Sequence, residues 1–382
     1  MTTERLFYQD SNLKSCQAKV LECRLQKDHY EIRLDRTVFY PEGGGQPYDT
    51  GYLDQIPVLE VQEKEDEIWH YTKEAVEVGT IVCGTIDWER RMDLMQQHSG
   101  EHIISGLIHE RYGYNNVGFH MGSDTITLDV DGEICEQDLK EIEAKANQYV
   151  WENHPIEITC PSPEELEQIP YRSKKELTGE VRIVTWPGVD ICACCGVHVK
   201  ASGDIGQIML VSAQKFKGGM RIEMICGKRA LEYSNYLKEQ NKKMSMLLSA
   251  KWNETWEAVE KLQKEYQQLK FQMVGMERKK IEEMTLQAAS KGNQLFFEEQ
   301  MSPEGIRKLA ADVMEVCGGR CAVFGGNDES GYRYVIGEKD GDLREFVKEM
   351  NQKLQGRGGG KPFFVQGSLQ ASRKEIEAFF AS

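Results

Sequence analysis

Long apolar runs are missing from this sequence of 382 residues. No stretch of about 18 consecutive apolar residues occurs, so we expect no membrane-spanning helix. The N-terminal stretch MTTERLFYQDSNLKSC carries charges early and has no apolar centre, so we expect no secretory signal peptide. Cysteine is present in an odd number, 11. Without an export signal, this number favours free or metal-bound thiols in a cytoplasmic protein over a disulfide framework.

Positive charge is scarce compared with negative charge. The 47 Lys and Arg residues face 62 Asp and Glu residues, which gives a net charge of −15. A uniformly acidic surface repels nucleic acid, so any contact with RNA has to come from local basic patches. Forty per cent of the residues are hydrophobic. The length and this apolar content fit two or three domains with their own cores.

The distribution of turn residues and apolar periods predicts an α+β protein with four regions. Residues 1–90 alternate apolar and polar residues in short runs, which predicts a small β-barrel. Residues 91–232 mix helical and strand patterns, which predicts a two-layer α/β domain. Residues 233–292 hold no proline and predict a long helical arm. Residues 293–382 again alternate helices and strands, which predicts a small α/β domain.

The helical arm carries the spacing of a coiled coil. Its apolar residues step by 3, 4, 3, 4 and 3 positions: Val259, Leu262, Tyr266, Leu269, Met273 and Met276. This seam fits a hairpin with another helix or a homodimer. A long helix packed on a neighbouring domain explains the same residues.

Two histidines four residues apart mark the start of the second region. A helix is expected there, with Asp93 at its N-cap or in its first turn and Gly113 as its stop. In a helix, His98 and His102 lie on one face and can reach the same metal ion. Two imidazoles do not complete the tetrahedron that zinc prefers, so the chain has to supply more ligands.

The stretch PGVDICACCGVHVKASG offers those ligands. Cys194 and His198 are again four residues apart, and thiolate and imidazole are ligands that zinc prefers. We therefore predict zinc bound by His98, His102, Cys194 and His198. Cys192 and Cys195 leave open which thiol binds, and a purely structural zinc remains an alternative.

The five residues HSGEH also match H-x-x-E-H, an inverted zinc-peptidase signature. In that interpretation Glu101 is a general base acting on a zinc-bound water. Such peptidases keep an open metal position, for which the Cys-x-x-x-His pair competes. A five-residue pattern is also weakly specific.

With both ligand pairs placed, the sequence resembles the editing domain of alanyl-tRNA synthetases. The resemblance rests on QQHSGEHIISGLI, CACCGVHVKASGDIGQIML, FYPEGGGQPYDTG and KGGMRIEMICGKRAL. No aminoacylation core precedes residue 1, so the chain looks like a freestanding alanyl-tRNA editing protein of the long form. The resemblance implies hydrolysis of the ester in tRNA(Ala) mischarged with serine, or with glycine. It also implies the four zinc ligands above, with Glu101 as the nearest carboxylate to assist a water.

The resemblance further implies a substrate pocket beside the zinc. Thr37 resembles a residue that senses the serine hydroxyl. The loop Gly43, Gly44 and Gly45 lets backbone approach the aminoacyl group, and it lacks the Gly-Lys-Ser/Thr ending of a P-loop. Glu42, Gln46 and His120 are candidates for polar contacts to the substrate, although a satisfied surface histidine explains His120 equally well.

The stretch GRGGGKPFF resembles the C-terminal domain of alanyl-tRNA synthetases. Arg357 and Lys361 flank its three glycines and are candidates for contacts to tRNA phosphates. The C-terminal region is expected to bind tRNA, to form a homodimer, or both. A non-catalytic, zinc-stabilised RNA-binding protein is the alternative from another functional class.

Overall fold

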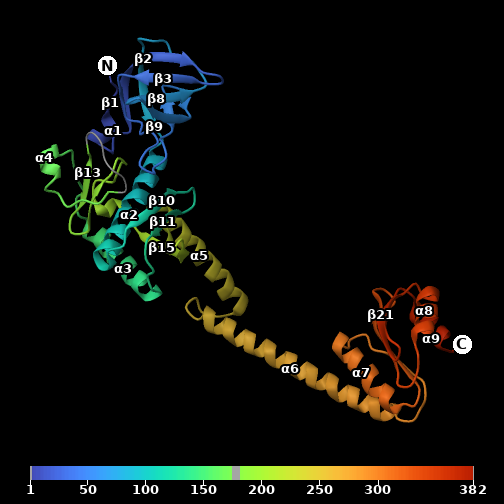
Figure 1. The fold of residues 1–382 in the computed structure, drawn as a ribbon. Helices are drawn as coiled ribbons and strands as arrows, with labels where there is room; N and C mark the ends of the chain where they lie inside the picture. The colour runs from blue at the N-terminus through green and yellow to red at the C-terminus, as the bar shows by residue number, and fades with distance from the viewer. Residues whose placement is uncertain (1, 174–180, 382) are drawn as a thin grey trace. The chain divides into compact units, whose positions relative to one another are not determined.

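The computed structural model describes residues 2–173 and 181–381, which divide into two compact units. Unit 1 is Met1–Asn241 and unit 2 is Lys242–Ser382. Among these described residues, no helix combines the length and the apolarity needed to cross a membrane. Strands and helices occur in both units, so the predicted α+β class is confirmed (Figure 1).

A seven-stranded antiparallel sheet fills the N-terminal part of unit 1 (Figure 1). Its strand order is β6-β5-β9-β2-β3-β8-β7. The strands are β2 (Ser15–Leu25), β3 (Tyr30–Leu34), β5 (Gly51–Leu53), β6 (Ile56–Val58), β7 (Glu60–Lys64), β8 (Glu67–Thr72) and β9 (Ile81–Ile86). The two edge strands, β6 and β7, are separated only by Leu59, so the sheet curls until its edges nearly meet. Beside it, β1 (Glu4–Arg5) pairs in parallel with β4 (Arg36–Thr37), and α1 (Leu6–Gln9) follows β1.

The helix α2 (Trp88–Tyr112) follows β9 after a single residue, Asp87. The Asp87 side chain accepts a hydrogen bond from the Arg90 amide and caps the helix. The prediction that Asp93 caps the helix or lies in its first turn is therefore wrong, because the helix starts five residues earlier. The predicted stop is confirmed, since Gly113 ends the helix with φ +71°.

Two further sheets surround α2. The strands β10 (Asn116–Met121), β11 (Ile126–Val130), β16 (Gly219–Cys226) and β15 (Ile208–Phe216) form an antiparallel sheet in that order. The second sheet joins β12 (Glu157–Thr159), β13 (Ile183–Trp186) and β14 (Asp190–Ala193). The remaining elements are α3 (Glu136–Glu152), α4 (Pro163–Leu166) and the 3₁₀ helix Ser202–Ile205. One hydrophobic core runs from Phe7 to Cys226 and joins these layers to the curled sheet.

Unit 2 packs helices on both faces of a five-stranded sheet (Figure 1). The strand order is β17 (Gln294–Phe297), β18 (Arg320–Asn327), β19 (Gly331–Glu338), β21 (Phe364–Leu369) and β20 (Arg357–Lys361). The end of α6 (Thr255–Ala288) and α7 (Pro303–Val316) cover one face, and α8 (Arg344–Lys353) and α9 (Arg373–Ala381) cover the other. The helix α5 (Gly227–Leu248) spans the boundary between the units.

The predicted coiled-coil seam lies on α6. Its side chains are exposed, from 39% at Val259 to 72% at Met276. Apolar residues of α6 are buried only near its C-terminal end, at Ile281 and Ala288. The helix is thus observed, whereas a partner helix for the seam stays a prediction. The four domain boundaries predicted from the sequence likewise stay predictions.

Candidate metal and substrate site

The two histidines of α2 lie one turn apart inside unit 1. His98 and His102 are 2% and 3% exposed, and their ring centroids are 5.3 Å apart. A spacing of four residues returns to the same helix face, and this face turns toward β14 and the turn after it. The helix therefore presents both imidazoles to the segment that carries Cys194 and His198.

That segment completes a group of four donors. The Cys194 Sγ atom lies 3.6 Å from His98 Nε2 and 3.4 Å from His198 Nε2. One donor atom from each of His98, His102, Cys194 and His198 lies within 4.8 Å of all the others. The structure thus brings together all four predicted ligands, although the two pairs are about ninety residues apart in the sequence.

The group fits a tetrahedral metal ion. Zn–S and Zn–N bonds of about 2.3 and 2.0–2.1 Å imply about 3.6 Å between donor atoms at a tetrahedral angle. The two Sγ–Nε2 distances match this value. His102 Nε2 is buried without a hydrogen-bond partner in the described part of the chain, which a bound metal would supply. The four residues can therefore hold a metal ion.

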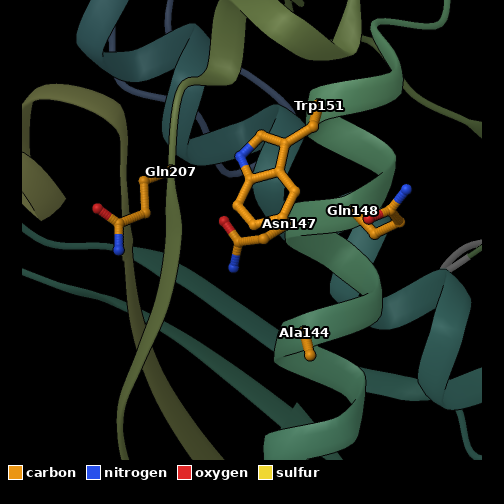
Figure 2. A pocket seen from close by; sticks show the side chains of 5 residues that line it. All are labelled: Ala144, Asn147, Gln148, Trp151 and Gln207. Carbon is orange, nitrogen blue, oxygen red and sulfur yellow. The ribbon is translucent and has the colours of Figure 1, made fainter.

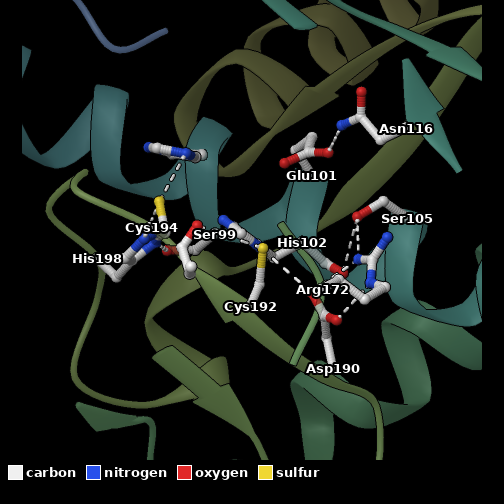
Figure 3. A network of polar contacts seen from close by, with 12 residues as sticks. Ser99, Glu101, His102, Ser105, Asn116, Arg172, Asp190, Cys192, Cys194 and His198 are labelled. Atoms are coloured by element: carbon white, nitrogen blue, oxygen red, sulfur yellow. Dashed lines mark hydrogen bonds and ion pairs between the residues drawn. The ribbon is translucent and has the colours of Figure 1, made fainter. Parts of the chain in front are cut away.

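In each of the three histidines, the Nδ1 atom contacts a different side chain of the surrounding fold. His98 Nδ1 lies 2.9 Å from Gln46 Oε1, and His198 Nδ1 lies 3.3 Å from Ser99 Oγ. His102 Nδ1 lies 3.2 Å from Asp190 Oδ2 (Figure 3). Such contacts set the ring orientation, so Nε2 of His98 and His198 face the thiol. Ser99 and Asp190 were not predicted from the sequence, because no local period links them to the ligands.

Burial and neighbouring charges set the protonation of the ligands. Burial raises the pKa of the Cys194 thiol, but the imidazoles of His98 and His198 outweigh burial and hold this pKa well below its usual range. Burial lowers the pKa of His198 to about 3. Thiolate and neutral imidazole are the forms that bind a metal, so Cys194 and His198 are in their binding forms near neutral pH. Burial disfavours a charged His102, but its hydrogen bond to Asp190 and the nearby thiols raise the pKa of His102 well above its usual range, so this imidazole has to release a proton when a metal binds.

The glycine-rich loop lies against this cluster. Gly44 has φ +59°, and a Cβ atom built on it would lie 3.5 Å from the Gly196 amide nitrogen. Gly196 itself permits close approach, because a Cβ there would lie 2.2 Å from His98 Cε1. Gln46 is fully buried, and its Oε1 also accepts from the Val197 amide at 3.2 Å. The loop is therefore joined to the ligand turn by both backbone packing and a side chain.

A buried ion pair fixes the same loop to α2. Arg91 and Asp49 are both 0% exposed, and Arg91 Nε donates to both Asp49 oxygens at 3.0 Å. Asp49 Oδ2 also accepts from the Tyr40 amide at 2.7 Å, across the mouth of the loop. Arg91 further donates to the Val38 carbonyl at 2.6 Å. This pair was not predicted from the sequence, since 42 residues separate its members.

Thr37 and the other candidate substrate residues differ in their surroundings. Thr37 is fully buried, and its Oγ1 lies 2.8 Å from His70 Nε2 and accepts from the Phe39 amide at 3.1 Å. Glu42 is exposed and lies 3.4 Å from Gln62 Nε2. His120 is exposed on β10. Contacts of these residues with a substrate stay predictions.

Glu101 lies on the ligand helix but outside the group of converging donors. Its carboxylate is 1% exposed and accepts a hydrogen bond from Asn116 Nδ2 of β10 (Figure 3). Neither group of candidate ligands found among the described residues includes Glu101. The arrangement of a peptidase, with this carboxylate beside the metal, therefore lacks structural support, and its role as a base stays a prediction.

A hollow of about 640 Å³ lies elsewhere on unit 1 (Figure 2). Its lining is Ala144, Asn147, Gln148, Trp151 and Gln207. It contains no titratable side chain and no residue of the ligand cluster, so it offers no acid–base chemistry.

The two predicted tRNA contacts lie in unit 2. Arg357 and Lys361 are the ends of β20, an exposed edge strand that contains the three glycines. Lys361 lines a hollow of about 370 Å³ together with Arg307 and the exposed Phe363. Arg307, on α7, was missed in the sequence because nothing local connects it to the glycine-rich stretch.

Three family models match separate parts of the chain. Residues 2–90 match the model described as tRNA synthetases class II (A). Residues 181–223 match the threonyl and alanyl tRNA synthetase second additional domain. Residues 289–381 match the DHHA1 domain.

Curated relatives extend the similarity over nearly the whole chain. The alanyl-tRNA editing protein AlaX-L of Pyrococcus horikoshii is 28% identical over 98% of this chain and 96% of its own length. The alanyl-tRNA editing protein Aarsd1-A of Xenopus laevis is 28% identical over 91% of this chain and 87% of its own length. The alanine–tRNA ligase of Pyrococcus furiosus is 30% identical over 98% of this chain but only 43% of the ligase. The resemblance predicted from the motifs is therefore confirmed.

Proposed function

From this similarity to alanyl-tRNA editing proteins, we propose that the chain hydrolyses the ester of tRNA(Ala) mischarged with serine, and also with glycine. The observation that carries the proposal is the convergence of three imidazoles and one thiol beside a glycine-rich loop. A pocket selective for alanine rejects serine poorly, because an added hydroxyl gives little discrimination. A separate hydrolytic site supplies the missing selectivity.

We assign the metal as zinc. Three neutral imidazoles and one thiolate match its preferred ligands and leave a net charge of +1 on the site. Zinc bound there supplies an electrophile that orients the aminoacyl group or polarises its ester carbonyl. Gln46, Ser99 and Asp190 hold the three imidazoles. Glu101 is the carboxylate we assign to assist a water.

The substrate side of the site is formed by the loop Gly43–Gln46 and by Thr37. His70 Nδ1 lies 3.1 Å from the Ile32 carbonyl, an acceptor, so this nitrogen carries the ring proton. His70 Nε2 is then an acceptor, and the Thr37 hydroxyl donates its hydrogen bond to it. Since Thr37 Oγ1 can then only accept, it favours a substrate that donates, as a serine hydroxyl does and an alanine methyl does not. Glu42 and His120 are assigned further polar contacts.

We assign tRNA binding to unit 2. Arg357 and Lys361 at the two ends of β20, together with Arg307, offer cations to phosphates despite the acidic total charge. The exposed seam of α6 is assigned to a homodimer, because its residues have the spacing of a coiled coil. In this proposal, editing, dimerisation and tRNA binding are divided among four domains, at 1–90, 91–232, 233–292 and 293–382.

Deacylation of Ser-, Gly- and Ala-tRNA(Ala) tests the proposal directly. The metal-loaded protein should release serine and glycine much faster than alanine, and removal of the metal should abolish release. Cys194→Ser should lower the rate by at least about 100-fold. Cys195→Ser, which alters the neighbouring exposed thiol, is the matched control and should leave the rate unchanged.

Two results would contradict the proposal. Tight binding of tRNA without metal-dependent release would favour a zinc-stabilised RNA-binding protein. Peptide hydrolysis that survives Cys194→Ser but not Glu101→Gln would favour the H-x-x-E-H peptidase.

A further inference from the structure

Two groups of candidate ligands overlap at His102. The first group is the set of four described above, and the second consists of His102, Asp190 and Cys192. All three members of the second group are buried. Nδ1 of His102 lies 3.2 Å from Asp190 Oδ2 of the second group, whereas Nε2 has no hydrogen-bond partner among the residues that the structure describes. The fold therefore contains two ways to bind a metal, which share one imidazole.

In the second group, the Asp190 carboxylate is already bound by the guanidinium of Arg172 (Figure 3). Arg172 Nε donates to Asp190 Oδ1 at 2.8 Å, and Nη2 donates to Oδ2 at 2.8 Å. The same Nη2 atom donates to Ser105 Oγ on α2 at 3.0 Å. The Arg172 backbone amide also donates to the Ile191 carbonyl at 2.8 Å, which fixes the arginine beside β14. Both carboxylate oxygens are thus engaged by one guanidinium, and its charge balances theirs.

Trp186 restricts the same imidazole from another side. Its ring stacks on His102 with centroids 5.8 Å apart and an angle of 19° between the planes. Together with the Asp190 contact, this packing fixes the orientation of the ring. A groove of about 330 Å³ is lined by Trp186, Arg172 and Asp190. A hydrated ion can therefore reach the carboxylate once the guanidinium is removed.

We propose that Arg172 and Asp190 are a positioning pair that selects between the two ligand groups. Asp190 accepts a hydrogen bond from Nδ1–H of His102 and turns Nε2 toward Cys194, and Arg172 prevents Asp190 from binding metal together with Cys192. The metal is then held by three imidazoles and one thiolate. This inference rests on the proposed metal site, but not on the identity of the substrate.

Cobalt binding to the full chain tests the selection. The metal is removed and Co²⁺ is titrated in, and the thiolate-to-cobalt absorption reports how many thiolates bind. The wild-type chain should show the intensity of one thiolate. Arg172→Met should raise the intensity per chain about twofold, because a second ion can then bind Asp190, Cys192 and His102 in addition to the ion in the first group. Cys192→Ser should remove that gain in the Arg172→Met background and change nothing in the wild type.

Asp190 variants test the positioning role. Asp190→Leu should weaken Co²⁺ and Zn²⁺ binding by about 10- to 100-fold, because His102 loses the acceptor that orients it. Asp190→Asn, which keeps an oxygen acceptor, should restore part of that affinity. The matched control is another bidentate pair of unit 1, in which Arg229 Nη2 of α5 lies 2.6 Å from Asp93 Oδ2 of α2. Asp93→Leu and Arg229→Met should leave the cobalt spectrum and the affinity unchanged.

The outcomes separate this inference from the proposed function. A wild-type chain that does not bind cobalt through a thiolate would overturn the metal site itself. A wild-type chain that binds through one thiolate, together with an identical Arg172→Met spectrum, would overturn the selection alone. Equal losses of affinity in Asp190→Leu and Asp93→Leu would overturn the positioning role, because both effects would then be general destabilisation.

Discussion

The helices α2 and α6 each carry a spacing pattern that suggested a partner, but their surroundings are opposite. On α2, the i, i+4 histidines are buried against the second ligand pair, which the same chain supplies. On α6, the apolar seam is exposed over its whole length. A spacing pattern shows which side chains share a face, but not what covers that face. For α2, the residues that cover the histidine face lie within unit 1, and the structure identifies them. For α6, experiments in solution have to identify what covers the seam.

The largest effect is expected from the buried pair that joins α2 to the glycine-rich loop. Arg91→Met leaves the Asp49 charge buried without its partner, which should lower the free energy of unfolding by about 3–5 kcal/mol. Urea unfolding measures this loss. Arg111→Met, at the exposed end of the same helix, is the control and should have a much smaller effect. Equal effects would mean that burial does not distinguish the two ends of α2.

A pH effect of similar size is expected from His70. Burial lowers the pKa of His70 to about 4, below the value of about 6.5 in the unfolded chain. Between these values the unfolded chain binds more protons, so stability is complete above pH 6.5 and falls as the pH drops toward 4. The loss should reach about 3 kcal/mol. His70→Gln should reduce the slope of unfolding free energy against pH in this window, and an unchanged slope would contradict the assignment.

Replacing a glycine by alanine should change the free energy of unfolding in opposite directions in the two helices. Gly106→Ala on α2 places a Cβ 2.7 Å from the Val189 carbonyl oxygen and 2.9 Å from Asp190 Cβ, so the start of β14 and the residue before it have to move and stability should fall by about 1–3 kcal/mol. Gly275→Ala on α6 meets nothing within 4 Å and should stabilise the helix by about 0.5–1 kcal/mol. Denaturant unfolding of both variants measures the pair. Destabilisation by Gly275→Ala would show that α6 is covered at this position, and stabilisation by Gly106→Ala would contradict the close contact on α2.

The smallest effect on folding is expected along the α6 seam. Leu269→Glu changes a side chain that is 58% exposed, so the free energy of unfolding of a monomer should change by less than about 0.5 kcal/mol. Light scattering should nevertheless detect the loss of the proposed homodimer. Leu286→Glu, on the same helix outside the seam, is the control. A wild-type chain that is monomeric at all concentrations would remove the homodimer from the proposed function.

The candidate ligands could be predicted because their signal is local. His98 with His102, and Cys194 with His198, each repeat a spacing that the helical period or a tight turn explains. The residues that orient them carry no such signal. Gln46 is 52 residues from His98, and its amide oxygen is engaged by the imidazole and the Val197 amide, while its contact with a substrate stays a prediction.

The start of α2 was predicted wrongly for a related reason. Asp87 and Asp93 are both acceptable N-caps by residue type. Only the path of the chain decides between them, because β9 ends at Ile86 and the helix begins two residues later. Asp93 instead pairs with Arg229, which lies 136 residues away. A cap can thus be predicted from local residues only when the preceding strand is also placed correctly.

The single residue between β9 and α2 has a practical consequence for protein engineering. Among the described residues one hydrophobic core runs from the curled sheet through the ligand helix to β16, so the proposed domains 1–90 and 91–232 are packed as one block. Transplanting this metal centre to another scaffold would therefore require moving the whole block. Shuffling it between homologues should succeed only when the crossover point falls beyond Cys226.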